Sequence, residues 1–174
     1  PAILDLAIKR RINVESVFGK AQLDPALLNQ SGTFVRVEQL IQLFDAAYES
    51  MNSPSFGLLL GESVHYHSLD LMGQLIATSR NLQQALDELL RFKDLVVPHV
   101  EFSLRTQGSD AIFEFSVDTS LVRRNLTVHQ DVVASTMVSI SKAIVPDGVN
   151  LKQVCFSHAD PGYSEDYERI FQVP

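Results

Sequence analysis

Apolar residues in the first hundred positions recur every three or four residues, which is the spacing of one face of an α-helix. The clearest run has apolar residues at Leu40, Ile41, Phe44, Ala47, Tyr48 and Met51. Asn52-Ser53-Pro54 ends this run, because the residue before a proline avoids helical backbone angles. Asn81 and Gln84 have approximately the form of a capping box. The pattern predicts helices at about 3–10, 14–19, 37–51, 56–65, 71–78 and 82–97.

The second half of the chain changes to a period of two, which is typical of a strand with one buried face. Two runs alternate in this way, with apolar residues at Val100, Phe102 and Leu104 and then at Ala111, Phe113, Phe115 and Val117. They predict a hairpin, followed by a helix at 125–144, a strand at 151–158 and a helix opened by Asp160-Pro161. We therefore expect an α+β fold with a helical N-terminal layer and a mainly antiparallel sheet, in the order β-β-α-β-α, with helices packed on the sheet.

Composition narrows the class of protein. The chain has 174 residues, of which 45% are hydrophobic and 20% charged, as in one globular domain. Its 14 basic residues face 21 acidic ones, so this chain alone is a poor candidate for binding the phosphate backbone of DNA. No apolar run approaches the roughly 20 residues of a membrane-spanning helix, so we expect no membrane contact. The lone Cys155 excludes an internal disulfide and fits a reducing compartment.

Few residues in the sequence indicate a catalytic site. Ser135, Ser139 and Ser141 lie on one predicted helix with no histidine near them in sequence, and Cys155 is expected to be an inert, buried thiol in a strand. Gly57 and Gly61 lack the Lys-Ser/Thr pair of a phosphate-binding loop. We therefore expect no enzyme activity, no catalytic residue, no metal and no cofactor.

The histidines each have a functional and a structural interpretation. His65 and His67 could ligate a metal from a loop, but no further ligand is near, so the end of a surface helix is favoured. His158 shares a strand face with Val154 and Phe156, and a hydrogen-bonded structural role is favoured. His99 follows a proline at the start of a strand, where simple exposure is expected.

Arg91 is the most interesting charged residue, because it lies between Leu90 and Phe92 on an apolar helix. Pairing with Asp94 or Glu88 is favoured, and the alternative is a bidentate contact with the carboxylate of a ligand. An apolar pocket with one or two such polar groups is the usual form of a small-molecule site. The candidate ligand-binding residues are Arg91, Tyr66, His67, Phe92 and Phe113.

Several segments together resemble a known family. They are Phe56-Gly57-Leu58-Leu59-Leu60-Gly61-Glu62, Leu71-Met72-Gly73-Gln74-Leu75, the stretch at 78–86, and the stretch at 154–161 with Tyr167 and Phe171. Their order and spacing resemble the N-terminal effector-sensing domain of AraC/XylS-type transcriptional regulators, in the ornithine-regulator-like branch. The resemblance identifies no ligand-contacting residue.

The resemblance implies a cytoplasmic bacterial transcription factor that senses a small-molecule effector, with amino acids and fatty-acid-like carboxylates as candidates. It implies that residues 1–174 are a single regulatory domain cut from a longer protein, whose separate C-terminal helix-turn-helix module binds the DNA. A homodimer is also compatible with it.

The alternative function is a ligand-free dimerisation or protein-interaction module. Its interface would be an exposed apolar face, such as part of the helix from Val128 to Ile144.

Overall fold

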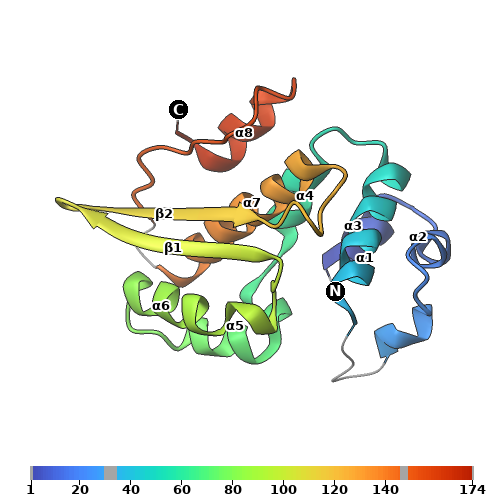
Figure 1. Cartoon of the computed structure of the whole chain (residues 1–174), viewed down its shortest axis with the longest axis horizontal. Coiled ribbons are helices and arrows are strands. Elements are labelled where there is room, and N and C mark those ends of the chain that lie inside the picture. The colour runs from blue at the N-terminus through green and yellow to red at the C-terminus, as the bar shows by residue number, and fades with distance from the viewer. Residues whose placement is uncertain (1, 30–34, 146–148, 174) are drawn as a thin grey trace.

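A computed structural model describes residues 2–29, 35–145 and 149–173 (Figure 1). Its helices are α1 (Ala2–Lys9), α2 (Val14–Lys20), α3 (Val37–Met51), α4 (Phe56–Ser63), α5 (Asp70–Ala77), α6 (Leu82–Phe92), α7 (Leu126–Ile144) and α8 (Ser164–Phe171). Short 3-10 turns occupy Pro25–Asn29, Tyr66–Leu69 and Lys93–Leu95. Together with a two-stranded sheet, these elements confirm the predicted α+β class.

Local signals at the helix ends act largely as the sequence predicts. Asn52 ends α3 in a left-handed conformation, with φ at 46°, before Pro54. The side-chain oxygen of Asn81 accepts a hydrogen bond of 2.9 Å from the backbone N–H of Gln84 and so caps α6. The side-chain oxygen of Gln84 accepts from the N–H of Arg80 instead of Asn81, so the second half of the capping box lies one residue earlier.

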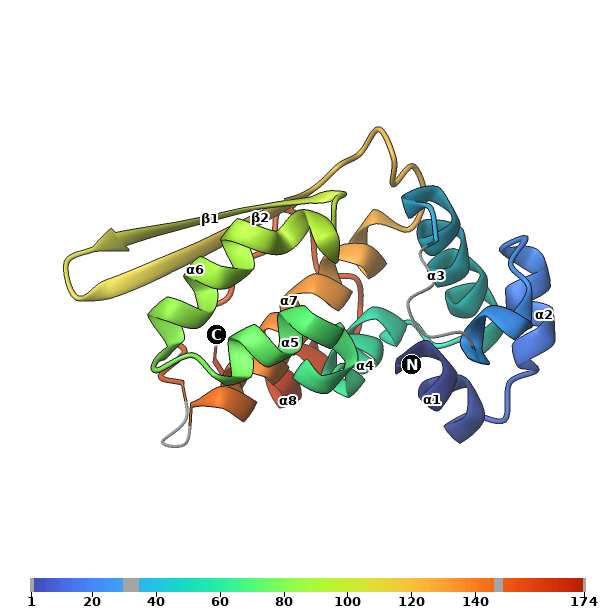
Figure 2. The same cartoon turned by 90° about the horizontal axis from the view of Figure 1, so that it is seen from below.

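The predicted hairpin is confirmed. Strand β1 (Val100–Gln107) pairs antiparallel with β2 (Asp110–Val117), so that Phe102 faces Phe115 and Leu104 faces Phe113. Gly108 allows the tight turn, because its φ is +64°. The hairpin lies along α6 and over α7, and the end with the turn extends beyond these helices (Figure 2).

The predicted strand at 151–158 is wrong. The chain there pairs with no strand in the described part of the structure, although the half-buried residues Val154, Phe156 and His158 alternate with exposed ones as expected. A period of two produces an extended segment with one inward face, whereas a strand also needs a neighbouring backbone to bond to. The described order is therefore β-β-α-α, with an extended segment before α8.

Helices α4 and α7 cross with their backbones in contact. A Cβ atom built on Gly57 would lie 2.4 Å from the carbonyl oxygen of Val128, and one on Gly61 would lie 2.5 Å from that of Val132. The hydroxyl of Ser135 donates a hydrogen bond of 2.7 Å to the carbonyl oxygen of Leu58 inside this contact. The two glycines that carry the family resemblance are thus required for close packing.

We predict that Gly61→Ala destabilises the domain by about 2–3 kcal/mol, because the added methyl group must displace backbone atoms of α7. Gly19→Ala is the matched control, since nothing lies within 4 Å of its Cβ position near the end of α2. That change should be neutral or stabilise by up to about 1 kcal/mol. Urea unfolding measures both, and equal effects would contradict the close crossing.

Candidate binding cavity

A cavity of about 320 Å³ lies between the N-terminal helices and the layer formed by α5, α6, α7 and the start of β1. Its size falls in the range of small-molecule sites. Most of its wall is aliphatic or aromatic, with contributions from Phe44, Leu60, Ile76, Leu89, Val133 and Ile140. Each of these residues lies on a helix whose apolar face the sequence predicts. The cavity is the space between these apolar faces where their side chains do not pack against one another.

The polar groups of the wall are few and uncharged at neutral pH. Among the described residues the wall contains no Asp, Glu, Lys or Arg. Its polar residues are Ser68, His99, His129, Thr136 and Ser141. A ligand that fits this cavity is therefore mainly apolar, with a small number of hydrogen-bonding groups.

His99 and His129 are the most unusual residues of the wall. Their side chains are almost fully buried, with 4% and 2% exposed, and their ring centroids lie 6.4 Å apart in an edge-to-face arrangement. The Nδ1 atom of His99 and both ring nitrogens of His129 have no hydrogen-bond partner among the described residues. Such orphaned atoms are rare, because each costs about 1–3 kcal/mol.

Burial keeps both imidazoles neutral. Desolvation and, to a smaller extent, the neighbouring His129 lower the pKa of His99 to about 4, while Asp118 acts in the opposite direction. Burial also lowers the pKa of His129. The carboxylate of Asp45 partly offsets this effect, because its Oδ1 lies 3.6 Å from Nε2 of His129. Asp45 itself accepts a hydrogen bond of 2.7 Å from Asn125.

A second buried polar cluster lies on the other side of α7. Asp131 is fully buried and accepts hydrogen bonds from the hydroxyl groups of Tyr163, at 2.6 Å, and of Tyr167. Nε2 of His158 lies 4.0 Å from the same carboxylate. Burial raises the pKa of Asp131, although the two hydroxyls oppose that change. Burial and the bonds to Asp131 also raise the pKa of both tyrosines.

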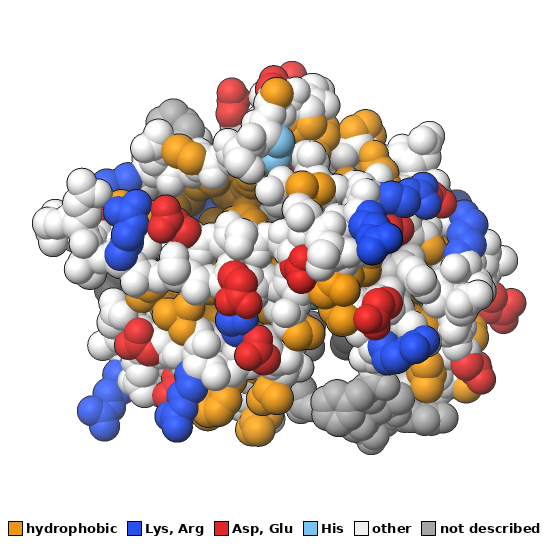
Figure 3. All heavy atoms as spheres, viewed as in Figure 1, with side chains coloured by type: hydrophobic (Ala, Val, Ile, Leu, Met, Phe, Trp, Pro, Cys, Tyr) orange, Lys and Arg blue, Asp and Glu red, His pale blue; other side chains and the backbone are white. Residues whose placement is uncertain are grey.

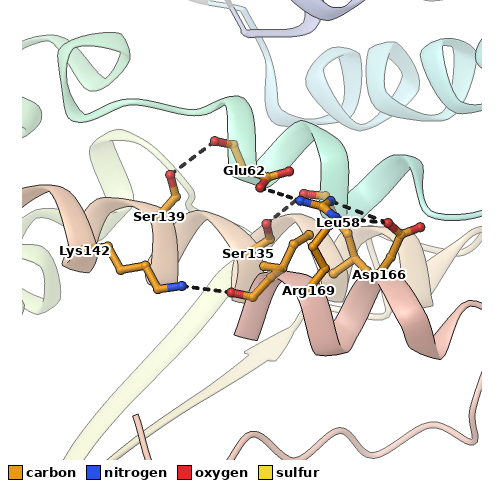
Figure 4. A network of polar contacts seen from close by, with 8 residues as sticks. Leu58, Glu62, Ser135, Ser139, Lys142, Asp166 and Arg169 are labelled. Carbon is orange, nitrogen blue, oxygen red and sulfur yellow. Dashed lines mark hydrogen bonds and ion pairs between the residues drawn. The ribbon is translucent and has the colours of Figure 1, made fainter. Parts of the chain in front are cut away.

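Helix α7 therefore connects the cavity to α8. Lys142 extends the α8 contact by donating a hydrogen bond of 3.0 Å to the carbonyl oxygen of Ile170, and Arg169 of α8 pairs with Glu62 of α4 at 2.7 Å (Figure 4). Of all the residues of α7, only Lys142 and Ala143 are exposed. The interface suggested for the Val128–Ile144 face is therefore wrong, because packing already covers that face.

The five candidate residues from the sequence lie outside the cavity wall. Arg91 is exposed, with its guanidinium 5.0 Å from the ring centroid of Phe92. Tyr66 stacks on His67, and Phe113 packs on Phe102 of the hairpin. The structure does not bring the five together into one site. Whether any of them contacts an effector stays a prediction.

Two favoured interpretations of individual residues are wrong. Within the described residues no ion pair joins Arg91 to Asp94 or Glu88, and Lys93 pairs with Asp94 instead, at 2.8 Å. Cys155 is exposed, since the extended segment carries it outward instead of burying it in a strand.

His99 corrects a further expectation and His129 was overlooked. His99 was expected to be exposed, but the turn after Pro98 directs it inward. His129 could have been found from helical spacing, because it shares a stripe with Val133, Met137 and Ile140. The start of a strand offers no comparable signal for His99.

The remaining chemical candidates have structural roles. Ser139 of α7 donates to the carbonyl oxygens of Glu62 and Val64, just as Ser135 does to that of Leu58 (Figure 4). His65 and His67 are exposed, and the described ranges hold no group of three metal-ligating side chains. None of the helices described is both long and apolar enough to cross a membrane.

We predict that acid destabilises the domain through His99. A histidine whose pKa is lowered in the folded state binds fewer protons than in the unfolded chain, so its contribution is complete above about pH 6.5 and is lost as the pH falls toward 4. Chemical unfolding at pH 7 and pH 4.5 should show that wild type loses about 1–3 kcal/mol more than His99→Gln. The exposed His65→Gln is the control and should behave as wild type, whereas equal losses in all three would contradict a neutral His99.

Comparison with known proteins agrees with this architecture. Residues 12–174 match the family described as the arabinose-binding domain of AraC transcription regulators, N-terminal. The chain is 22% identical over 172 residues to the ornithine utilization regulator of Pseudomonas aeruginosa, and the match covers 99% of this chain and 50% of that protein. The chain thus spans about half the length of this relative. The resemblance noted in the sequence is confirmed, and the chain belongs to the arabinose-binding domain family of AraC transcription regulators.

Proposed function

We propose that this chain is the ligand-sensing regulatory domain of a bacterial AraC-type transcription factor, and that its effector occupies the 320 Å³ cavity. The observation that carries the proposal is the cavity itself, a large apolar space with two buried histidines that have ring nitrogens without a hydrogen-bond partner among the described residues. Natural cores are close-packed, so a space of this size is unusual unless it serves a ligand. The whole regulator would act in the cytoplasm, where its DNA target lies.

The composition of the wall favours a fatty-acid-like effector over an amino acid. An amino acid such as ornithine carries two ammonium groups, and each would need a carboxylate partner when buried. The described wall offers no carboxylate. An acyl chain needs only apolar surface along most of its length, and this cavity supplies it.

Control of DNA binding would pass through α7 and α8. The face of α7 with His129 and Val133 borders the cavity, while Asp131 and Lys142 hold α8 from its other side. The matched family is N-terminal in its regulators, so we place the DNA-binding module beyond α8. A ligand that favours one position of α7 would thereby change how α8 presents that module.

Contact with DNA would depend on that module and not on this domain. On the face drawn in Figure 3, acidic side chains lie among the basic ones. The net charge of −7 also opposes binding to phosphates. Association into a homodimer stays a prediction, which measurement of mass against concentration would test.

We predict that medium-to-long-chain carboxylic acids raise the melting temperature of the domain, while ornithine and polyamines do not. A ligand at ~100 times its dissociation constant stabilises the folded state by about 2.7 kcal/mol, which corresponds to several degrees for a domain of this size. Thermal unfolding against a panel of these compounds measures the shift.

The variant Ala85→Leu should abolish this shift, because Ala85 is buried in the cavity wall and a larger side chain there fills the space. Without ligand the same variant should keep or gain stability, since it fills a void. Ala143→Leu makes the same change on the exposed surface of α7 and should respond as wild type. A shift that persists in Ala85→Leu would place the effector elsewhere.

We predict that Tyr167→Phe uncouples sensing from DNA binding in the full-length regulator. The variant removes one of the hydroxyl groups that bond to Asp131, at a cost of about 1–3 kcal/mol in the α7–α8 contact. Tyr167 is outside the cavity wall, so effector affinity should change less than about threefold, while the effect of ligand on operator affinity decreases. Tyr66→Phe, away from this cluster, is the control, and an unchanged response in Tyr167→Phe would argue against transmission through Asp131.

A further inference from the structure

His99 and His129 both line the cavity, while their orphaned nitrogens are themselves buried, so a ligand in the cavity would bond to them after a turn of the rings. Three ring nitrogens without partners are costly inside a folded core, and that cost is removed only when something else bonds to them. A neutral imidazole has one donor and one acceptor nitrogen, so the pair can donate to the carbonyl oxygen and accept from the hydroxyl group of one protonated carboxyl group. The polar group of the ligand therefore belongs at this pair.

We propose that His99 and His129 bind the carboxyl group of an aliphatic monocarboxylic acid with an acyl chain. The acid binds together with one proton. This inference rests on the proposed function, because it takes the cavity to be the effector site. It adds which end of the cavity receives the head group, which residues select an acid, and how affinity responds to pH.

The shape of the wall fits a long ligand with its polar group at one end. The wall follows α7 from His129 to Ile144, which is roughly 22 Å at 1.5 Å per residue. Beyond the histidines its lining is mostly aliphatic, with Val133, Met137 and Ile140 along α7 and Leu86 on α6. An acyl chain would run along this stretch, away from the two rings.

The charges around the pair explain the proton. An aliphatic acid is ionised in water above about pH 5, as carboxyl groups in general are. His99 faces His129 and Asp118, and with its pKa lowered to about 4 it is neutral at pH 7. His129 faces His99 from one side and Asp45, on α3, from the other.

A carboxylate that enters this apolar space cannot keep its charge without a partner. It is therefore bound either as the neutral acid or beside an imidazolium that Asp45 helps to stabilise. In both cases one proton comes from the solution, and no covalent bond is formed or broken. The complex contains one proton more than its separate components.

The experiment is isothermal titration of the domain with octanoic and decanoic acids and with the matched alcohols 1-octanol and 1-decanol. Titrations at pH 6, 7 and 8 give the dissociation constants, and titrations at pH 7 in phosphate and in Tris give the number of protons taken up. We expect about one proton per acid bound and a dissociation constant that rises up to tenfold per pH unit. The alcohols should show neither effect.

His99→Gln and His129→Gln should reduce the preference for acid over alcohol at least tenfold at pH 7, while the affinity for the alcohols changes little. His65→Gln, on the exposed surface, should leave both affinities as in wild type. Acid binding without proton uptake, or an unchanged preference in both variants, would overturn the assignment of the histidine pair.

The result also separates this inference from the proposed function. If acids and alcohols bind equally at all pH values and Ala85→Leu abolishes both, the cavity is the effector site but the histidines are not its acid-binding end. If no member of either series binds, both are overturned.

Discussion

The architecture depends on the close crossing of α4 and α7. Gly57 and Gly61 bring the two backbones into contact, and Ser135 of α7 donates a hydrogen bond to the carbonyl oxygen of Leu58 in α4. Because successive residues of a helix point about 100° apart, one helix face held in a fixed contact sets the direction of every other face. His129 must then border the cavity, and Asp131 must lie toward α8.

The two buried polar clusters on either side of α7 differ in how many of their polar atoms have a hydrogen-bond partner. Asp131 accepts hydrogen bonds from two hydroxyl groups of the α8 region, so its carboxylate has its partners within the protein. By contrast, within the part of the chain that the structure describes, Nδ1 of His99 and both ring nitrogens of His129 have no hydrogen-bond partner. A folded protein is only marginally stable, so under the proposed function a ligand that bonds to these nitrogens would shift the population of states appreciably. This asymmetry suits a domain that must be stable without its effector and must still respond to it.

Periodicity predicted the helices and the hairpin well, because each needs only one buried face and a local end signal. It failed at 151–158, where alternating burial occurs without a partner strand. It also did not identify the residues that line the cavity. Arg91 was attractive because it interrupts an apolar helix, yet it lies over Phe92 at the surface. The place of His99 after Pro98 predicts an exposed side chain, yet this residue is buried in the cavity wall.

The sequence by itself determined the element types, the glycine-rich segment of α4 and the family, since these depend on spacing and residue size along a local stretch. Only the tertiary structure decided that a cavity exists and which residues line it. An apolar stripe looks the same in the sequence whether it packs against another stripe or lines a cavity, because the spacing of apolar residues marks one face of the helix and not what lies opposite it. The meeting of His99, before β1, with His129, on α7, is likewise a long-range contact that no local pattern encodes.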